Sequence, residues 1–269
     1  MPVYKNTYWL TKITNSDTMT KYTLPAILLL VLLTNPDSVF CQQDSVKTTT
    51  SGATTPTGTT KIWGQVDGIA FEGAVQGPST ESTPLQIACV FEYTEGDIFN
   101  SPPALPAAVN GMVHLDQDLK GIITTLRKNG RFTGHSLETL LITPPAGSIK
   151  AGKLLLIGLG DRNKFTPEDM LIVAGVAMRE ALRLGVTQYA FASDLKDAGI
   201  DSPTSLVAGY GVRGAVEAYR TQVFLQQQKM ATVKPITKVT LLAGPSFFTT
   251  AGQGIREAIA GYNGPLLEK

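Results

Sequence analysis

Side chains that hold transition metals are scarce in this sequence. Its 269 residues include two cysteines and two histidines. Neither His114 nor His135 has a cysteine or a second histidine at ligand spacing, whereas zinc sites are built from clusters of such residues. This scarcity excludes metal sites built on cysteine and histidine clusters and leaves all-oxygen sites open. We predict no metal site, no bound cofactor and no disulfide framework. Asp116 and Asp118, which stand near His114, are interpreted as a solvated acidic corner.

An excess of charge of one sign is also missing. The chain has 23 lysines and arginines against 22 aspartates and glutamates, for a formal net charge of +1. Domains that bind nucleic acid carry a strong basic excess, so we predict that this chain does not bind nucleic acid. Its length and its hydrophobic share of 43% fit one or two globular domains with a real core.

A hydrophobic run long enough to cross a membrane is absent too. The main apolar run, residues 24–33, is about ten residues long, whereas a membrane-spanning helix needs roughly 20. We therefore predict no stable membrane span in the mature protein. Lys21 precedes the run and Asn35-Pro36 ends it, which is typical of the core of a secretory signal.

A signal peptide is accordingly predicted over residues 1–41, for which Met19 is a better start than Met1. The side chains near its end are small enough for signal peptidase to cleave between Cys41 and Gln42. The mature protein would then be periplasmic or secreted. A lipid on Cys41 is the alternative, which the bulky residue before it disfavours.

The next segment, residues 42–61, has the composition of a linker. It reads QQDSVKTTTSGATTPTGTTK and offers almost no apolar side chain for burial. Such a segment cannot offset the entropy lost on folding, so we predict a flexible tether. The folded domain is predicted to comprise residues 62–269.

Within this domain, strand and helix patterns alternate. Alternating or short apolar runs predict strands at 63–75, 85–93 and 137–143, and helical spacing predicts a helix at 115–127. Further along, strands are predicted at 153–160, 186–192 and 238–243, and helices at 166–185, 202–224 and 248–260. This order predicts an α/β fold in three layers, with a mixed, mostly parallel sheet between helices.

The string GYGVRG at residues 209–214 satisfies the glycine pattern of dinucleotide-binding folds. That pattern requires a strand directly before it, because the pyrophosphate sits at a helix N-terminus. Here Ser202-Pro203 begins a helix, and helical spacing continues beyond Gly214. We therefore predict that the string lies within a helix, that it does not bind NAD, and that its glycines allow close helix packing.

The segment after the strand at 238–243 is the stronger of two anion-binding candidates. It offers main-chain N–H groups and hydroxyls without an acidic side chain before Glu257. Its candidate ligand-binding residues are Gly244, Ser246, Thr249, Thr250 and Gly252. The alternative is an ordinary strand-to-helix loop.

Gly158 and Gly160 are the weaker candidates for phosphate binding, because they leave a buried strand toward a helix. The helix begins about six residues later, and Glu168 and Asp169 at its start would repel an anion. No catalytic residue is predicted anywhere in the chain.

Several stretches carry a family resemblance. They are Leu119-Lys-Gly121, GRFTG at 130–134, LLLIGLG at 154–160, AGVAMREAL at 174–182 and GAVEAY at 214–219. Over about residues 85–269 the chain resembles the N-terminal domain of the leucyl aminopeptidase (cytosol aminopeptidase) family. The resemblance implies a fold similar to the macro domain, in a domain that does not carry the family's chemistry.

The family's catalytic half would bring two metal ions and a signature containing the run Asn-Thr-Asp-Ala-Glu-Gly-Arg. That run does not occur among the 269 residues, so we expect no peptidase activity from this chain alone. The expected role is a non-catalytic binding or assembly module linked to peptide metabolism, with a protein partner or self-association. Two alternatives stay open: a macro-like domain that binds a nucleotide or ADP-ribose, and a subunit of a metalloaminopeptidase whose catalytic domain is on another chain.

Overall fold

The computed structural model describes residues 54–94 and 104–263. They form a seven-stranded sheet in the order β1-β2-β7-β6-β3-β5-β4. The strands are β1 (Thr60–Val66), β2 (Ile69–Ala74), β3 (Leu85–Val90), β4 (Thr139–Ile142), β5 (Lys153–Gly158), β6 (Gln188–Ala192) and β7 (Lys238–Leu242). The helical elements are η1 (Ala107–Val109), α2 (Gly111–Asp118), α3 (Ile122–Lys128), α4 (Asp169–Arg183), α5 (Thr204–Gln227) and α6 (Phe248–Asn263).

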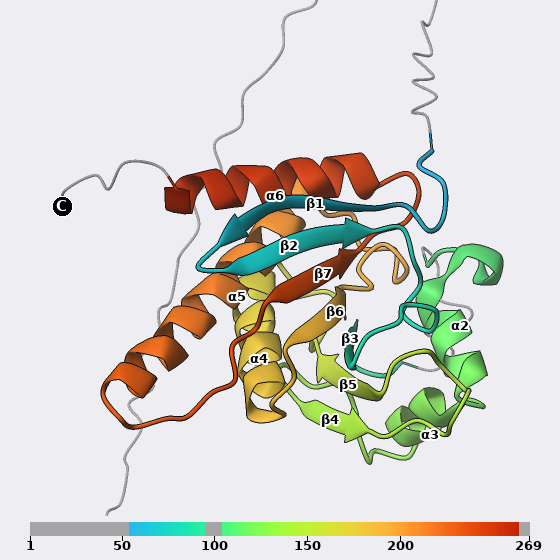
Figure 1. The fold of residues 1–269 in the computed structure, drawn as a ribbon. Helices are drawn as coiled ribbons and strands as arrows, with labels where there is room; N and C mark the ends of the chain where they lie inside the picture. The colour runs from blue at the N-terminus through green and yellow to red at the C-terminus, as the bar shows by residue number, and fades with distance from the viewer. Residues whose placement is uncertain (1–53, 95–103, 264–269) are drawn as a thin grey trace, which may run out of the picture. The chain divides into compact units, whose positions relative to one another are not determined.

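The five inner strands are parallel, and the two edge strands β1 and β4 run antiparallel to their neighbours. Helices cover both faces of the sheet (Figure 1). In the inner strand β3, Ile87 and Cys89 pack with α4, α5 and α6, whereas Ala88 and Val90 pack with α2 and α3. This alternation confirms the predicted three-layer α/β fold with a mixed, mostly parallel sheet.

The predicted strand at 63–75 is a hairpin of two strands. Asp67 and Gly68 form its turn with φ of 51° and 82°, which matches the positive values that a two-residue hairpin turn requires. The domain also begins before the predicted boundary at 62, because β1 starts at Thr60 and the Gly58 N–H donates to Val75 O over 2.8 Å. The segments predicted as a signal peptide and, for the most part, as a tether lie outside the described residues.

The prediction of a single helix over 115–127 is wrong, because the chain forms the two helices α2 and α3 there. Lys120 and Gly121 have φ of 57° and 75°, which ends α2. The buried Asp116 then accepts the Ile123 N–H over 2.8 Å and the Thr124 hydroxyl over 2.6 Å at the start of α3. Asp116 is therefore a helix cap, and the predicted acidic corner does not form.

The string GYGVRG lies inside α5, as predicted. The close approach that its glycines were expected to allow occurs at Gly214, where a β-carbon would lie 2.0 Å from the main-chain oxygen of Leu171 on α4. At Gly209 and Gly211 the nearest atoms would be at ordinary contact distances of 3.5 and 3.8 Å. One glycine of the three therefore fixes the packing of α5 on α4.

Candidate functional site

A cleft opens where the carboxyl ends of β2, β6 and β7 meet. It is lined by residues that follow these strands, by the first turns of α5 and by residues near the start of α2. In open parallel sheets, ligands bind at this edge, because the loops after neighbouring strands converge there. The cleft has a volume of about 490 Å³, which lies in the range of small-molecule sites.

Most of the cleft lining is apolar. Phe191 and Leu241 contribute from the ends of β6 and β7, and Val207 and Ala208 contribute from α5. The titratable side chains that line the cleft are those of His114, Asp194, Lys196 and Asp197. An apolar lining with a few polar groups is the usual composition of a site that binds a small molecule and fixes its orientation.

The two acids of the cleft lie in the loop after β6. Asp194 has a φ of 56°, a left-handed conformation that aspartate tolerates better than most residues. Asp197 Oδ2 accepts the Gly111 N–H over 2.9 Å at the start of α2. Asn110 caps the same helix by accepting the Val113 N–H over 3.0 Å. Asn110 also donates to Asp197 O over 3.1 Å, so the loop and α2 hold each other in place.

Both acids hold a proton more strongly than an exposed aspartate does. Burial, followed by the charge of Asp197, raises the pKa of Asp194 well above its ordinary value. Burial likewise raises the pKa of Asp197 to about 6, although hydrogen bonds from the Gly111 and Met112 N–H groups act in the opposite direction. The charge of an ionised Asp197 therefore adds to burial in disfavouring the ionised form of Asp194.

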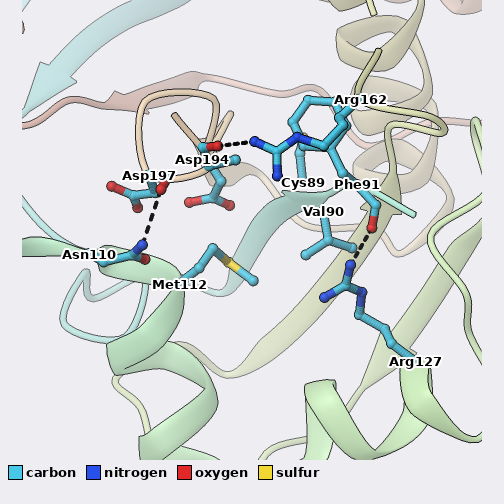
Figure 2. A pocket seen from close by; sticks show the side chains of 10 residues that line it. Cys89, Val90, Phe91, Asn110, Met112, Arg127, Arg162, Asp194 and Asp197 are labelled. Carbon is cyan, nitrogen blue, oxygen red and sulfur yellow. Dashed lines mark hydrogen bonds between the residues drawn. The ribbon is translucent and has the colours of Figure 1, made fainter. Parts of the chain in front are cut away.

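A smaller pocket of about 40 Å³ adjoins the same two acids (Figure 2). Arg127 lies on its α3 side and donates to Phe91 O over 2.5 Å. Arg162 donates to Ala198 O, the main-chain oxygen next to Asp197. Cys89 is fully buried at the pocket, and burial raises the pKa of its thiol well above the ordinary value. Because the thiolate is the reactive form, Cys89 belongs to the core.

The structure brings one of the five stronger candidate residues to the cleft. Gly244 lines it, whereas Ser246, Thr249 and Thr250 are exposed and are not part of its lining. Gly252 is buried, and a β-carbon there would lie 2.1 Å from the Trp63 ring. The five residues therefore do not converge on one site.

The weaker candidates, Gly158 and Gly160, have no amide available for a phosphate. The Gly158 N–H donates to Glu138 O over 2.8 Å, and the Gly160 N–H donates to Gly134 O over 2.9 Å. Between them, the Leu159 N–H donates to Val90 O over 2.7 Å. These glycines serve the packing of the strand end against the loop that contains Gly134.

Sequence reasoning missed Asp194 and Asp197. A signal was present, because both acids follow directly on the strand predicted at 186–192, at the sheet edge where ligands bind. In residues 54–94 and 104–263, no three His, Cys, Asp or Glu side chains lie close enough together to hold a metal ion. Within the same ranges, no helix is both long enough and apolar enough to cross a bilayer.

Comparisons with known proteins agree with the family resemblance. Residues 98–219 match the model of the cytosol aminopeptidase family, N-terminal domain. A probable cytosol aminopeptidase of Burkholderia orbicola is 29% identical over 154 residues, which are 56% of this chain and 29% of the relative. One of Roseiflexus castenholzii is 28% identical over 140 residues, which are 52% of this chain and 28% of the relative.

One solved structure shows the same fold, and a second superposes less closely. A point mutant of tomato leucine aminopeptidase superposes with a TM-score of 0.51 at 16% identity, over 76% of this chain and 38% of that one. A macrodomain of Oceanobacillus iheyensis with ADP gives 0.48 at 13% identity, over 76% of this chain and 98% of that one. The chain thus spans less than a third of the length of the two curated relatives.

Proposed function

We propose that this chain, whose residues 98–219 match the N-terminal domain of the cytosol aminopeptidase family, is a non-catalytic module that binds a small ligand in the cleft. The observation that carries the proposal is the cleft itself, with about 490 Å³ at the carboxyl ends of β2, β6 and β7. Its apolar lining and its few polar groups suit a ligand that is buried on one side and oriented by hydrogen bonds.

The side chains of the cleft support binding rather than catalysis. Lys196 Nζ donates to Ser202 O over 2.7 Å, and Asp197 is bonded to the start of α2. A nucleophile needs a base within hydrogen-bonding reach, and the described residues that line the cleft include no cysteine and no such pair. Ligand binding without turnover is therefore the function that we assign to the cleft.

A cleft-filling substitution tests the proposal. Ala208 lines the cleft, whereas Leu206 on the same helix is exposed and does not. We expect a fragment screen by ligand-observed NMR to find binders that Ala208→Phe weakens at least about tenfold and Leu206→Phe leaves unchanged. Binders that are insensitive to Ala208→Phe, or the absence of binders at millimolar concentration, would refute the proposal.

A nucleotide or ADP-ribose is a less favoured ligand. Its phosphates would lie near Asp197, which is mostly ionised at pH 7 because its pKa is about 6, and of the predicted anion loop only Gly244 lines the cleft. Like charges at close range disfavour binding. We expect calorimetric titration with ADP-ribose to give no heat of binding up to millimolar ligand. Micromolar affinity would make ADP-ribose or a nucleotide the favoured ligand of the cleft.

A link to peptide metabolism is proposed from the relatives alone, which are named as probable cytosol aminopeptidases. Such a link could run through a catalytic domain on another chain. By itself this chain should hydrolyse leucine p-nitroanilide at the blank rate with zinc or manganese. Turnover that a chelator abolishes would contradict a non-catalytic role. We also propose export, on the grounds of the predicted signal peptide.

A further inference from the structure

Asp194, which lines the cleft, has a buried side-chain oxygen atom without a hydrogen-bond partner among the described residues. The residue as a whole is half-buried, but its Oδ2 atom is buried and has no hydrogen-bond partner in the described part of the chain. The carboxyl group also accepts the Cys89 N–H at the end of β3. Buried polar atoms in folded proteins nearly always have a partner, so the unpartnered Oδ2 of a residue that lines a cleft points to a donor supplied by a ligand.

Asp194 lines both the cleft and the small pocket, and Figure 2 shows it among the residues of the small pocket. On the cleft side, the other titratable groups are His114, Lys196 and Asp197. Lys196 donates to Ser202 O, and Asp197 accepts from Gly111. No basic side chain of the cleft forms an ion pair with Asp194.

Two arginines, Arg127 and Arg162, line the small pocket. Arg127 donates to Phe91 O and Arg162 donates to Ala198 O. Neither arginine lines the cleft, which is the wider of the two spaces. A ligand in the cleft therefore meets Asp194 and Asp197 and neither arginine.

We propose that Asp194 binds the ammonium group of a primary amine whose apolar body lies in the cleft. This inference rests on the proposed function, because it names the ligand class of the same cleft. The ammonium would donate to Asp194 Oδ2 in a charge-assisted hydrogen bond. The apolar body would contact Phe191 and Leu241, which line the cleft at the strand ends.

The proton balance follows from the burial of Asp194. Ionising a buried carboxyl group that has an unpartnered oxygen is costly, so Asp194 keeps its proton when no ligand is bound. A cation within about 4 Å favours the ionised form. The amine enters already protonated at neutral pH, Asp194 loses its proton to solvent on binding, and the complex holds a carboxylate opposite an ammonium.

Matched probes of one shape test the ammonium requirement. We expect calorimetry on the full chain at pH 7 to show that 2-phenylethylamine binds at least about tenfold more tightly than 2-phenylethanol. The anion 3-phenylpropionate should bind more weakly still, because it has no ammonium for Asp194 and would lie near Asp197, which is mostly ionised at pH 7. Ala208→Phe should abolish binding of the amine.

A pair of isosteric variants tests the residue. Asp194→Asn keeps an oxygen that can accept the Cys89 N–H but removes the charge, and we expect it to weaken amine binding at least about tenfold. Asp118→Asn makes the same change at an exposed position outside the cleft, and should leave affinity unchanged. Binding enthalpies in buffers of different ionisation enthalpy should show proton release by the parent and none by Asp194→Asn.

The outcomes separate the inference from the proposed function. Equal affinity of the amine and the alcohol, or amine binding that Asp194→Asn leaves intact, would overturn the role of Asp194. If Ala208→Phe abolished binding of both probes in that case, the cleft would still be the ligand site. Absence of amine binding at millimolar concentration would also overturn the inference, and the fragment screen would then decide the proposed function separately.

Discussion

Gly214 on α5 lies directly against the main chain of Leu171 on α4. A β-carbon at Gly214 would be 2.0 Å from Leu171 O and 3.0 Å from the Ala174 β-carbon. We expect Gly214→Ala to lower the free energy of unfolding by about 1–3 kcal/mol or more, because the two helices must separate. Urea denaturation followed by circular dichroism measures the change.

Gly211→Ala is the matched variant in the same helix. Its new β-carbon would meet Leu241 Cδ2 at 3.8 Å, an ordinary contact. Removing a glycine from a helix interior gains up to about 1 kcal/mol, so we expect this variant to be at least as stable as the parent. NAD should shift the melting temperature of neither variant nor of the parent. An NAD-dependent rise that a glycine substitution removed would restore the dinucleotide reading of GYGVRG.

Asp197 should make the protein less stable as pH rises. Burial raises its pKa to about 6 from an ordinary 3.8, so the folded state binds more protons than the unfolded state between these values. Its stabilising share is complete below about pH 4 and is lost as pH rises through 6. Asp197→Asn should therefore gain up to about 3 kcal/mol relative to the parent between pH 4 and 7.

Urea denaturation at several pH values measures how the free energy of unfolding changes with pH. Asp201→Asn is the control, because Asp201 is fully exposed. A difference between Asp197→Asn and the parent that stayed constant from pH 4 to 7 would show that Asp197 does not titrate in this way.

Glu138 should have the opposite dependence on pH. Burial alone raises its pKa, but hydrogen bonds from Thr133, Gly134 and His135 outweigh burial and lower it below the ordinary 4.5. Its Oε2 accepts the Gly134 N–H over 2.9 Å and the His135 N–H over 3.1 Å. This stabilisation is present above the unfolded pKa and is lost as pH falls through the folded value.

We therefore expect Glu138→Ala to cost about 1–3 kcal/mol at pH 7, because the loop amides lose their acceptor, and less at pH 3. The exposed Glu257 gives the control, and Glu257→Ala should change stability by at most about 0.5 kcal/mol. Equal effects of the two substitutions at pH 7 would count against the role of Glu138.

Export predicts a defined mature N-terminus. Expressed in a bacterial host, the chain should appear outside the cytoplasm with Gln42 as its first residue, as measured by intact mass and N-terminal peptide sequencing. Replacing Leu29 with arginine breaks the apolar run and should retain the unprocessed protein. Cytoplasmic accumulation of unprocessed parent protein would contradict the proposed localisation.

The half of the fold in which strands and helices alternate, from β5 to α6, was predictable because its sequence patterns are local. The apolar run of β5 and the helical spacing of α4 and α5 lie within short windows. The hairpin at Asp67-Gly68 was missed although Asp-Gly is a strong local turn signal. The order of the strands was not predictable, because the insertion of β7 between β2 and β6 depends on contacts between distant parts of the chain.

The candidate site shows the same division between local and distant causes. Glycine-rich loops drew attention to Gly244 and Gly158, because their composition is visible in the sequence. The unusual state of Asp194 arises from burial beside Cys89 on another strand, and that of Asp197 from its contact with Gly111. A buried acid looks like any surface acid until the distant segments that cover it are known.

The close contact at Gly214 has a counterpart at Gly254, where a β-carbon would lie 1.9 Å from Ser205 O on α5. Helix α5 thus packs on α4 at Gly214 and on α6 at Gly254, and neither position has room for a β-carbon. Sequences that share this three-helix arrangement should keep glycine at both positions, even where overall identity is too low to align. The pair gives a criterion for finding distant members of the group in genome data, independent of any catalytic motif.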